Sequence, residues 1–222
     1  MESANTEGEK MKVIDMTRTI HPGMPIFPGD PEPEFRAMAD CERDGFRERV
    51  IMLASHTGTH MDAPAHVIPR GTTLDAFPPS RFCGTAICVP CESAGEGGTI
   101  TLEMIRSCRG ADEAEFLLLR TGWEDRWGTE SYFAHYPVLS DEAARWIVSA
   151  RKKGVGLDVM SPDPLDDASL ALHHILLGGG TLIVENLCSL KELPEGIFRF
   201  CALPLKLQDA DGAPARAVAF IE

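Results

Sequence analysis

Short runs of apolar and β-branched residues recur along the whole chain, and turn-forming residues bound each of them. Runs of this length are typical of β-strands. Several are apolar on both faces, so we expect a sheet that other elements cover. Eight strands are predicted, at Val13–Met16, Glu48–Ala54, Thr85–Val89, Glu115–Arg120, Val155–Val159, Thr181–Glu185, Phe198–Leu207 and Arg216–Ile221.

Three segments carry the residue pattern of a helix. The clearest is Ser140–Lys153, in which Ser140 can cap the first turn, acidic residues follow it, and basic residues fill the last turn before a glycine. Shorter helices are expected at Thr101–Cys108 and at Ala168–Leu177, which precedes three glycines. Many strands with a few interspersed helices predict a single-domain α/β fold with a mixed sheet.

A proline-rich stretch between Pro22 and Pro31 can be neither a helix nor a central strand, because each proline lacks a backbone donor and fixes its own φ. We expect a stiff loop there, in which Ile26 and Phe27 form either a pocket wall or a rigid surface connection. Residues 1–10 are typical of a flexible, solvated tail, and residues 11–222 are expected to form the domain.

Composition and charge exclude several classes of protein. The 222 residues are 44% hydrophobic and 25% charged, as in an ordinary globular domain. The 21 basic and 34 acidic residues give a net charge of −13, which repels phosphate backbones and anionic lipids. No apolar run approaches the length of a membrane span. We therefore expect no nucleic-acid partner and no membrane association.

The seven cysteines are irregularly spaced, and the start of the chain lacks the layout of a secretory signal. Reduced thiols and a cytoplasmic location are therefore expected. Cys88 and Cys91 form a single C-x-x-C without a second pair. We interpret them as small buried side chains near a strand, in preference to a zinc or redox site.

Candidate chemistry is concentrated just after a predicted strand, where His56, His60 and His66 lie within eleven residues. With Asp62 they offer imidazole nitrogen and carboxylate oxygen, the ligand types of a catalytic divalent metal with an open coordination position. Gly58 allows a tight turn, so that the loop can close on one ion. We expect His56, His60 and Asp62 to bind the metal.

His66 is expected to act as a general acid or base beside the metal-bound water, with a role as a fourth ligand left open. Histidines that are simply satisfied in the core or at the surface are the alternative for the whole cluster. Two other histidines, His21 and His135, lie among turn residues and are expected to be solvated.

A second group of candidates lies late in the chain. Glu185 ends an apolar strand, where a buried carboxylate needs a partner that a metal could supply. His173 and His174 lie on a predicted helix. These residues alone leave two possibilities open: a histidine and Glu185 join the metal site, or the histidine is on the surface and Glu185 pairs with a basic residue.

Residues 56–66 also resemble a known family signature. They read HTGTHMDAPAH, and the signature of the cyclase-like metal-dependent hydrolases is H-x-G-T-H-x-D-x-P-x-H. This family contains bacterial kynurenine formamidase (arylformamidase) and isatin hydrolase. The resemblance extends over nearly the whole chain, including the proline-rich loop and the block at residues 173–187. It implies a swivelling β/β/α fold that assembles as homodimers or homotetramers, with the pocket near a subunit interface.

The resemblance also implies residue roles. His56, His60 and Asp62 would bind a metal, and Asp62 could bridge to a second ion held by His173 and Glu185. His66 would be the catalytic histidine. His173 fits better than its neighbour because it stands twelve residues before Glu185, as the family's ligand does.

Phe27 would bind substrate. It stands where the family's formamidases usually have a tryptophan, so the aromatic wall is kept and the indole N–H is absent. Trp123 and Trp127 are further candidates for the pocket walls and could equally be core residues.

The expected function is arylformamidase-like hydrolysis of a small amide, formamide or lactam. One or two divalent ions, zinc or manganese, would activate water, with His66 moving the proton. Two alternatives remain. The same site could serve a metal-dependent cyclase or dehydratase that acts on an oxo-acid, or the chain could be a metal-binding partner protein without catalysis.

Overall fold

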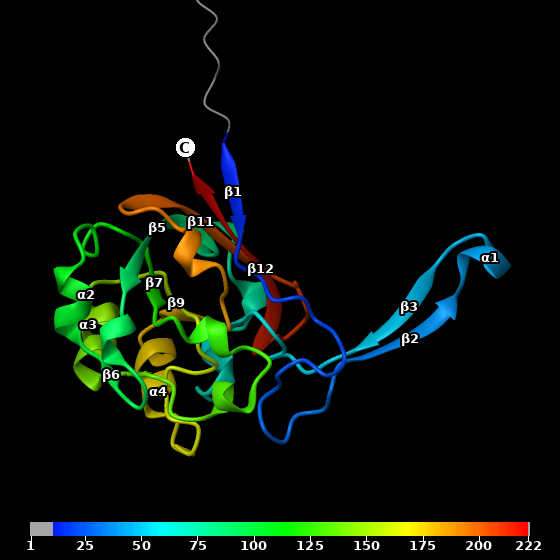
Figure 1. Cartoon of the computed structure of the whole chain (residues 1–222), viewed down its shortest axis with the longest axis horizontal. Helices are drawn as coiled ribbons and strands as arrows, with labels where there is room; N and C mark the ends of the chain where they lie inside the picture. Colours follow the sequence, from blue (N-terminus) through cyan, green and yellow to red (C-terminus); the bar gives the residue numbers. More distant parts are fainter. Residues whose placement is uncertain (1–10, 222) are drawn as a thin grey trace, which may run out of the picture.

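The computed structural model describes residues 11–221, and within them one sheet of eight strands organises the chain (Figure 1). The tail expected at residues 1–10 lies outside the described residues. The strand order is β1-β12-β11-β5-β7-β9-β10-β4. In chain order the strands are β1 (Lys12–Asp15), β4 (His60–Asp62), β5 (Cys83–Pro90), β7 (Phe116–Arg120), β9 (Gly154–Leu157), β10 (Leu182–Glu185), β11 (Ile197–Pro204) and β12 (Gly212–Ile221).

The sheet closes on itself into a barrel-like ring. Strand β4 pairs antiparallel with β10 on one side and with the start of β12 on the other. Strands β5, β7, β9 and β10 run parallel to one another, whereas β11, β12 and β1 add antiparallel pairings. The expected α/β fold with a mixed sheet is therefore confirmed, and the closure places the ends of β4 and β10 side by side.

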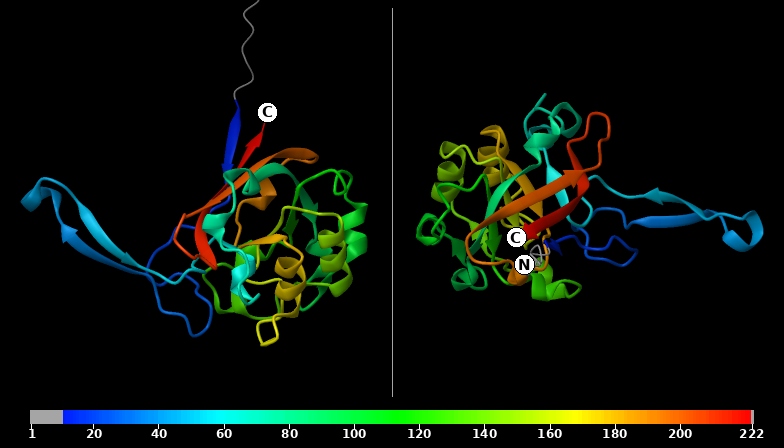
Figure 2. Two further views of the ribbon diagram at one scale, coloured as in Figure 1. Left: turned by 180° about the vertical axis from the view of Figure 1, so that it is seen from behind. Right: turned by 90° about the horizontal axis from the view of Figure 1, so that it is seen from above.

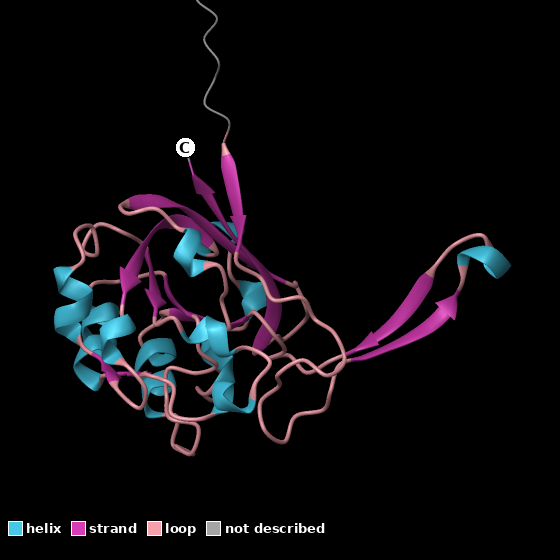
Figure 3. Cartoon of the chain, viewed as in Figure 1, coloured by secondary structure: helices cyan, strands magenta, loops and turns pink. Residues whose placement is uncertain are grey.

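Three helices lie on one flank of this ring, α2 (Leu102–Ser107), α3 (Asp141–Ser149) and α4 (Ala171–Gly178) (Figure 3). The expected cap forms at α3, where Ser140 accepts a hydrogen bond from the backbone N–H of Ala143, and Thr101 caps α2 in the same way through the N–H of Met104. A short parallel pair, β6 (Thr99–Ile100) and β8 (Val138–Leu139), lies at the same flank. Among the described residues, no helix has the length and apolar character to cross a membrane.

Apolar side chains fill both sides of the sheet, as the two-sided apolar runs predicted. On β7, Phe116 and Leu118 belong to the core inside the ring, whereas Leu117 and Leu119 belong to the core under the helices. The ring of Phe116 meets that of Phe200 edge to face, with 5.2 Å between the centroids. The barrel wall is thus held from both faces, which gives the site a rigid support.

One hairpin stands apart from the body. Strands β2 (Glu34–Ala39) and β3 (Glu48–Met52), joined by α1 (Cys41–Asp44), project as an arm in every view (Figures 1 and 2). The strand expected at Glu48–Ala54 thus forms, but outside the main sheet. The arm's first strand was not predicted, because its residues alternate weakly and follow a proline-rich segment.

The predicted end of the long helix is wrong. Helix α3 ends at Ser149, and Arg151 adopts a left-handed conformation with φ 54°. Lys152 is buried, and its Nζ donates hydrogen bonds to the carbonyl oxygens of Asp112 (2.8 Å) and Ala114 (2.6 Å). The basic residues were expected in the last helical turn, near the negative end of the helix dipole, but the chain leaves the helix before them and two carbonyl groups bind one of them.

Other boundaries shift by a few residues. The late helix begins at Ala171 instead of Ala168, and Gly178 is its last residue instead of its stop. Strand β11 ends at Pro204, earlier than expected, and β12 begins at Gly212, earlier than expected. The loop expected between Pro22 and Pro31 contains no helix or strand.

Replacing Lys152 with Met should lower the free energy of unfolding by about 1–3 kcal/mol, because the two carbonyl groups lose their donor while the apolar stem remains. Urea denaturation measures this change. Arg151→Gln is the matched control, since Arg151 is exposed, and it should change the value by less than about 0.5 kcal/mol. Equal, small effects of both substitutions would show that Lys152 is not the buried donor described here.

Candidate metal site

The pleat of two paired strands brings the first site residues together. On β4, Met61 points into the barrel core, so His60 and Asp62 on either side of it point to the opposite face. On β10, Val184 likewise points inward and Glu185 outward. The register places Glu185 directly opposite His60. Two strand ends thus present an imidazole and two carboxylates to one buried space.

A tight turn positions His56 and orients His60. Gly58 has φ 66°, and a Cβ there would lie 3.1 Å from Cε of Met24, so glycine suits both the conformation and the close packing. The Gly58 carbonyl oxygen accepts a hydrogen bond from Nδ1 of His60 (2.8 Å). Nε2 of His60 is thereby left to face the carboxylates.

Helix α4 supplies His173 from the other side of the site. Asp163 accepts hydrogen bonds from the backbone N–H groups of Leu172 and His173 at the start of the helix. The same carboxylate binds Nδ1 of His173 at 2.6 Å. His174, the next residue, is exposed and points elsewhere. Asp163 therefore fixes both the helix start and the ring of His173.

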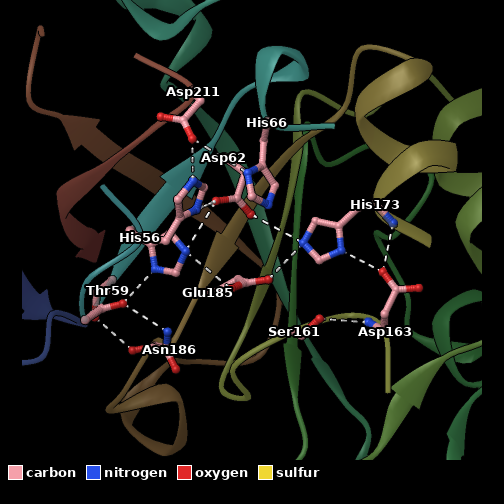
Figure 4. Close-up of polar contacts among 12 residues, drawn as sticks. His56, Thr59, Asp62, His66, Ser161, Asp163, His173, Glu185, Asn186 and Asp211 are labelled. Carbon is pink, nitrogen blue, oxygen red and sulfur yellow. Dashed lines mark hydrogen bonds and ion pairs between the residues drawn. The ribbon is translucent and has the colours of Figure 1, made fainter. Parts of the chain in front are cut away.

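The side chains of His56, Asp62, His173 and Glu185 converge on one another (Figure 4), and His60 joins them. Nδ1 of His56 lies 2.7 Å from Oδ1 of Asp62, and Nε2 of His60 lies 3.3 Å from the same oxygen. Nε2 of His60 and Nε2 of His173 each lie 3.3 Å from an oxygen of Glu185. Asp62 is only 1% exposed and Glu185 only 5%. These residues form one buried polar centre, although they come from three separate parts of the chain.

In His56, His60 and His173, the ring nitrogen that points away from Asp62 and Glu185 also has a hydrogen-bond partner. Nε2 of His56 contacts Asp211 at 3.0 Å, and the corresponding partners are the Gly58 carbonyl for His60 and Asp163 for His173. Metal-binding histidines characteristically donate their second N–H to a carboxylate or a backbone carbonyl, which fixes the ring and the tautomer. The arrangement therefore fits metal ligands better than isolated buried histidines.

Two carboxylate oxygens in the centre accept no hydrogen bond from any described residue, Oδ2 of Asp62 and Oε1 of Glu185. Burying such an atom without a partner carries a substantial cost in free energy. Asp62, His56 and His60 form one group whose ligand atoms lie within 4.8 Å of one another, and Asp62, His173 and Glu185 form a second. Asp62 belongs to both, so its two oxygens can serve two neighbouring cations.

The pKa shifts reflect the negative charge of the centre. Burial by itself lowers the pKa of His173, but its contacts with the carboxylates of Asp163 and Glu185 outweigh burial and raise that pKa to about 10. Burial likewise opposes a charged His60, yet Asp62 and Glu185 raise its pKa well above the ordinary value. The carboxylates therefore stabilise positive charge at this place.

His66 lies at the mouth of the centre, at the end of a short 3₁₀ turn (Pro64–His66). Its ring centroid is 4.1 Å from that of His56 and 5.6 Å from that of His173. Burial, together with the neighbouring His56 and His173, lowers its pKa. With His56 and Asp211 it forms a third, partly buried group of possible ligand atoms, and its ring lies next to the other two groups without belonging to them.

A cavity of about 250 Å³ opens onto these side chains. Its walls combine apolar residues of the proline-rich loop with apolar residues of the body. Phe27 is at the rim and 43% exposed. The residues that line the cavity beyond the polar centre are Pro25, Ile26, Phe27, Asp30, Gly58, Tyr132, Met160, Ser161, Leu170 and Asn186.

The structure brings together every residue that the sequence analysis proposed for the metal, and it places Phe27 and His66 at the cavity. Trp123 and Trp127, in contrast, pack in or against the core and do not line it. The aromatic wall of the body is Tyr132, whose hydroxyl donates to Asn186 at 2.7 Å. Its position among several aromatic residues gave no signal that it would face the cavity.

Asp163, Asp211 and Asn186 were not predicted. Asp163 and Asp211 stand in turn-like segments beside proline or glycine, where an aspartate usually indicates only a turn. Asn186 follows directly after Glu185, and its Nδ2 donates to the Gly58 carbonyl at 3.0 Å. Asp211 and Asn186 act on residues 155 and 128 positions away, and Asp163 acts across a loop on the helix that starts after it, so only the folded chain reveals their partners. His21 and His135 are exposed, as expected.

Comparison with known proteins gives consistent matches along most of the chain. The model of the Cyclase family, described as "Putative cyclase", matches residues 14–164. Kynurenine formamidase of Paracidovorax citrulli is 32% identical over 92% of this chain and 94% of its own length. Kynurenine formamidase of Salinibacter ruber is 34% identical over 94% of this chain and 97% of its own length.

Solved structures share the fold. Isatin hydrolase A from Ralstonia solanacearum superimposes with a TM-score of 0.84 at 24% identity, over 96% of this chain and 92% of that chain. The structure of a "predicted metal-dependent hydrolase" from Bacillus stearothermophilus has a TM-score of 0.79 at 29% identity, over 95% and 98% of the two chains.

Gly212 offers a test of the geometry, because a Cβ there would lie 2.4 Å from Cε1 of His56. Gly212→Ala should displace the His56 ring and weaken zinc or manganese binding by roughly 10–100-fold, as measured by competition with a chelating dye. Gly178→Ala is the control, since its Cβ would make only an ordinary 3.5 Å contact with Ile68. Unchanged metal affinity in the Gly212 variant would mean that His56 does not take part.

Proposed function

Because this chain belongs to the Cyclase family, we propose that it is a metal-dependent hydrolase that cleaves a carbon–nitrogen bond of a small amide, formamide or lactam. One observation supports this proposal above the others: Oδ2 of Asp62 and Oε1 of Glu185 are buried among three histidines and accept no hydrogen bond from any described residue. A divalent cation satisfies such a centre. The names of the relatives, kynurenine formamidase and isatin hydrolase, indicate the reaction class.

The proposed metal ligands are the two sets of converging side chains that share Asp62. His56, His60 and Asp62 would hold one ion, and Asp62, His173 and Glu185 a second. Nitrogen and carboxylate ligands are suited to zinc or manganese. When bound, such an ion polarises a carbonyl group and makes water more acidic. Asp163, Asp211 and the Gly58 carbonyl keep the ligand rings in place throughout.

His66 is proposed to move the proton. Its Nδ1 lies 3.8 Å from Oδ2 of Asp211, which leaves Nε2 for the reacting atoms. The ring takes a proton from the attacking water and gives it to the leaving nitrogen, as general base and then general acid. Its lowered pKa keeps the imidazole neutral and able to accept that proton near pH 7.

The cavity walls indicate the kind of substrate. Phe27, Ile26 and Met160 offer apolar contact surface, and no lysine or arginine is among the described residues that line the cavity. A neutral aromatic amide can lie against these walls with its carbonyl group toward the histidines. Ser161 and Asn186 provide polar groups for further contacts. We therefore propose an aryl formamide or a fused aryl lactam as the substrate class.

The chain is proposed to assemble as a homodimer or homotetramer. Its projecting arm exposes Met38 (58%), Phe46 (55%) and Ile51 (56%), and an isolated two-stranded ribbon is only marginally stable in water. A second copy of the chain that covers the arm would stabilise it. Sedimentation velocity tests the assembly, and a monomer at micromolar concentrations would contradict it. The cytoplasmic location stays a prediction from the cysteine pattern.

The proposed activity is tested with the metal-loaded protein and a panel of N-formyl aryl amines, isatin-like lactams and simple esters. We expect hydrolysis of a formamide or lactam, loss of activity with a chelator, and incorporation of ¹⁸O from labelled water into the acid product by mass spectrometry. An unlabelled product would indicate cyclisation or dehydration instead. Absence of hydrolysis across the panel, with metal bound, would contradict the proposal.

His66→Ala should lower kcat by roughly 10²–10⁴-fold and leave metal content unchanged, because His66 lies outside the two buried ligand groups. Steady-state kinetics and metal analysis on the same preparation measure both quantities. His174→Ala is the control and should retain activity, since His174 is exposed beside the ligand His173. Loss of metal from the His66 variant would instead make His66 a ligand.

A further inference from the structure

Two cysteines far apart in the sequence lie opposite each other in the sheet. Strands β5 and β11 are antiparallel neighbours, and their register pairs Cys83 with Cys201. The backbone N–H of Ala202 donates to the carbonyl oxygen of Phe82 at 3.0 Å, so the cysteines occupy a non-hydrogen-bonded position. At such positions the two Cα atoms are about 4.5 Å apart, and the side chains are at their closest.

The two thiols also point to the same face. On β11, Phe200 and Ala202 belong to the core inside the barrel, so Cys201 between them points outward. On β5, Ala86 points inward, so Cys83 three residues earlier shares the outward face. Both residues are partly exposed. Burial, and then the neighbouring Cys83, raise the pKa of Cys201 to about 12.

The other cysteines lack this arrangement. Cys88 belongs to the core inside the barrel and Cys91 to the core under the helices, so the C-x-x-C pair lies on opposite faces of the sheet and both thiols are buried. This agrees with their interpretation as small apolar side chains. Cys41 is exposed at the tip of the arm. The strand register thus brings Cys83 and Cys201 together, although their spacing in the sequence does not indicate a cysteine pair.

We propose that Cys83 and Cys201 are a site of reversible thiol oxidation, at which a low-molecular-weight disulfide such as oxidised glutathione converts them to an intramolecular disulfide. The expected Cα separation lies within the 4.4–6.8 Å or so that disulfides require, so no backbone movement is needed. Arg199, two residues away on the same face of β11, offsets only part of the effect of burial, which raises the pKa of Cys201.

The chemistry balances as two exchange steps. One cysteine thiolate attacks a sulfur of oxidised glutathione, forms a mixed disulfide and releases one glutathione thiolate, which takes up a proton. The opposite cysteine then loses its proton, attacks the protein sulfur of the mixed disulfide and expels the second glutathione. Two protein thiols are oxidised to one disulfide, and one glutathione disulfide is reduced to two thiols.

The crosslink would enclose the segment that contains α4, His173 and Glu185. Neither cysteine is in contact with a proposed ligand or lines the cavity. The inference therefore does not depend on the proposed function, and it can fail or succeed separately.

The test uses the full chain, fully reduced and then incubated with oxidised glutathione at pH 8. Free thiols are blocked with iodoacetamide, and a non-reducing peptide map is read by mass spectrometry. We expect one peptide pair joined through Cys83 and Cys201, which dithiothreitol separates again. Alkylation of both cysteines to the level of untreated protein would overturn the proposal.

Single variants test the second exchange step. In Cys201→Ser, Cys83 should retain bound glutathione at least about 10-fold more than in the wild type, because the resolving thiol is gone. Cys83→Ser should form the corresponding adduct on Cys201 more slowly, because burial raises the pKa of Cys201. Cys41→Ser is the matched control and should form the crosslink as the wild type does. Wild-type protein that accumulates stable glutathione adducts on both cysteines, without the crosslink, would also overturn the proposal.

Discussion

The central constraint on this protein is the burial of two carboxylates, Asp62 and Glu185, at neighbouring strand ends. A buried carboxylate is tolerated only when positive charge and hydrogen bonds compensate for the lost water. Here three imidazoles face the carboxylates, and two of the oxygens still accept no hydrogen bond from any described residue. The site therefore has a chemical reason to bind cations that is independent of any resemblance to other proteins. The outer partners of the histidines, above all Asp163, are arranged around the same requirement.

The strand pairings that close the sheet also assemble the site. Strand β4 is only three residues long, yet it pairs with β10 and with β12. The first pairing sets His60 opposite Glu185, and the second brings Gly212 against the ring of His56. Apolar packing on both faces of the neighbouring strands makes this framework stiff. Any cation bound here would consequently link β4 to β10 and to helix α4.

The sequence predicted the parts of this arrangement that depend on residues close together in the chain. His56, His60 and Asp62 lie within seven residues, and strand periodicity located most of the sheet. Pairings between distant segments were not predictable in this way. Asp211 acts on a histidine 155 positions earlier in the chain, and the partnership of Cys83 with Cys201 exists only through strand register. Lys152 was misjudged because a basic residue after a helix is usually solvated, whereas here two carbonyl groups lie within its reach.

The central claim is that His56, His60 and Asp62 converge on a cation. The most direct measurement is anomalous diffraction from crystals of the protein purified with zinc or manganese, recorded on both sides of the metal's absorption edge. The account predicts an anomalous peak about 2.0–2.2 Å from Nδ1 of His56, Nε2 of His60 and a carboxylate oxygen of Asp62. A metal-loaded crystal with no peak among these three side chains, or with its metal only at the protein surface, would contradict it.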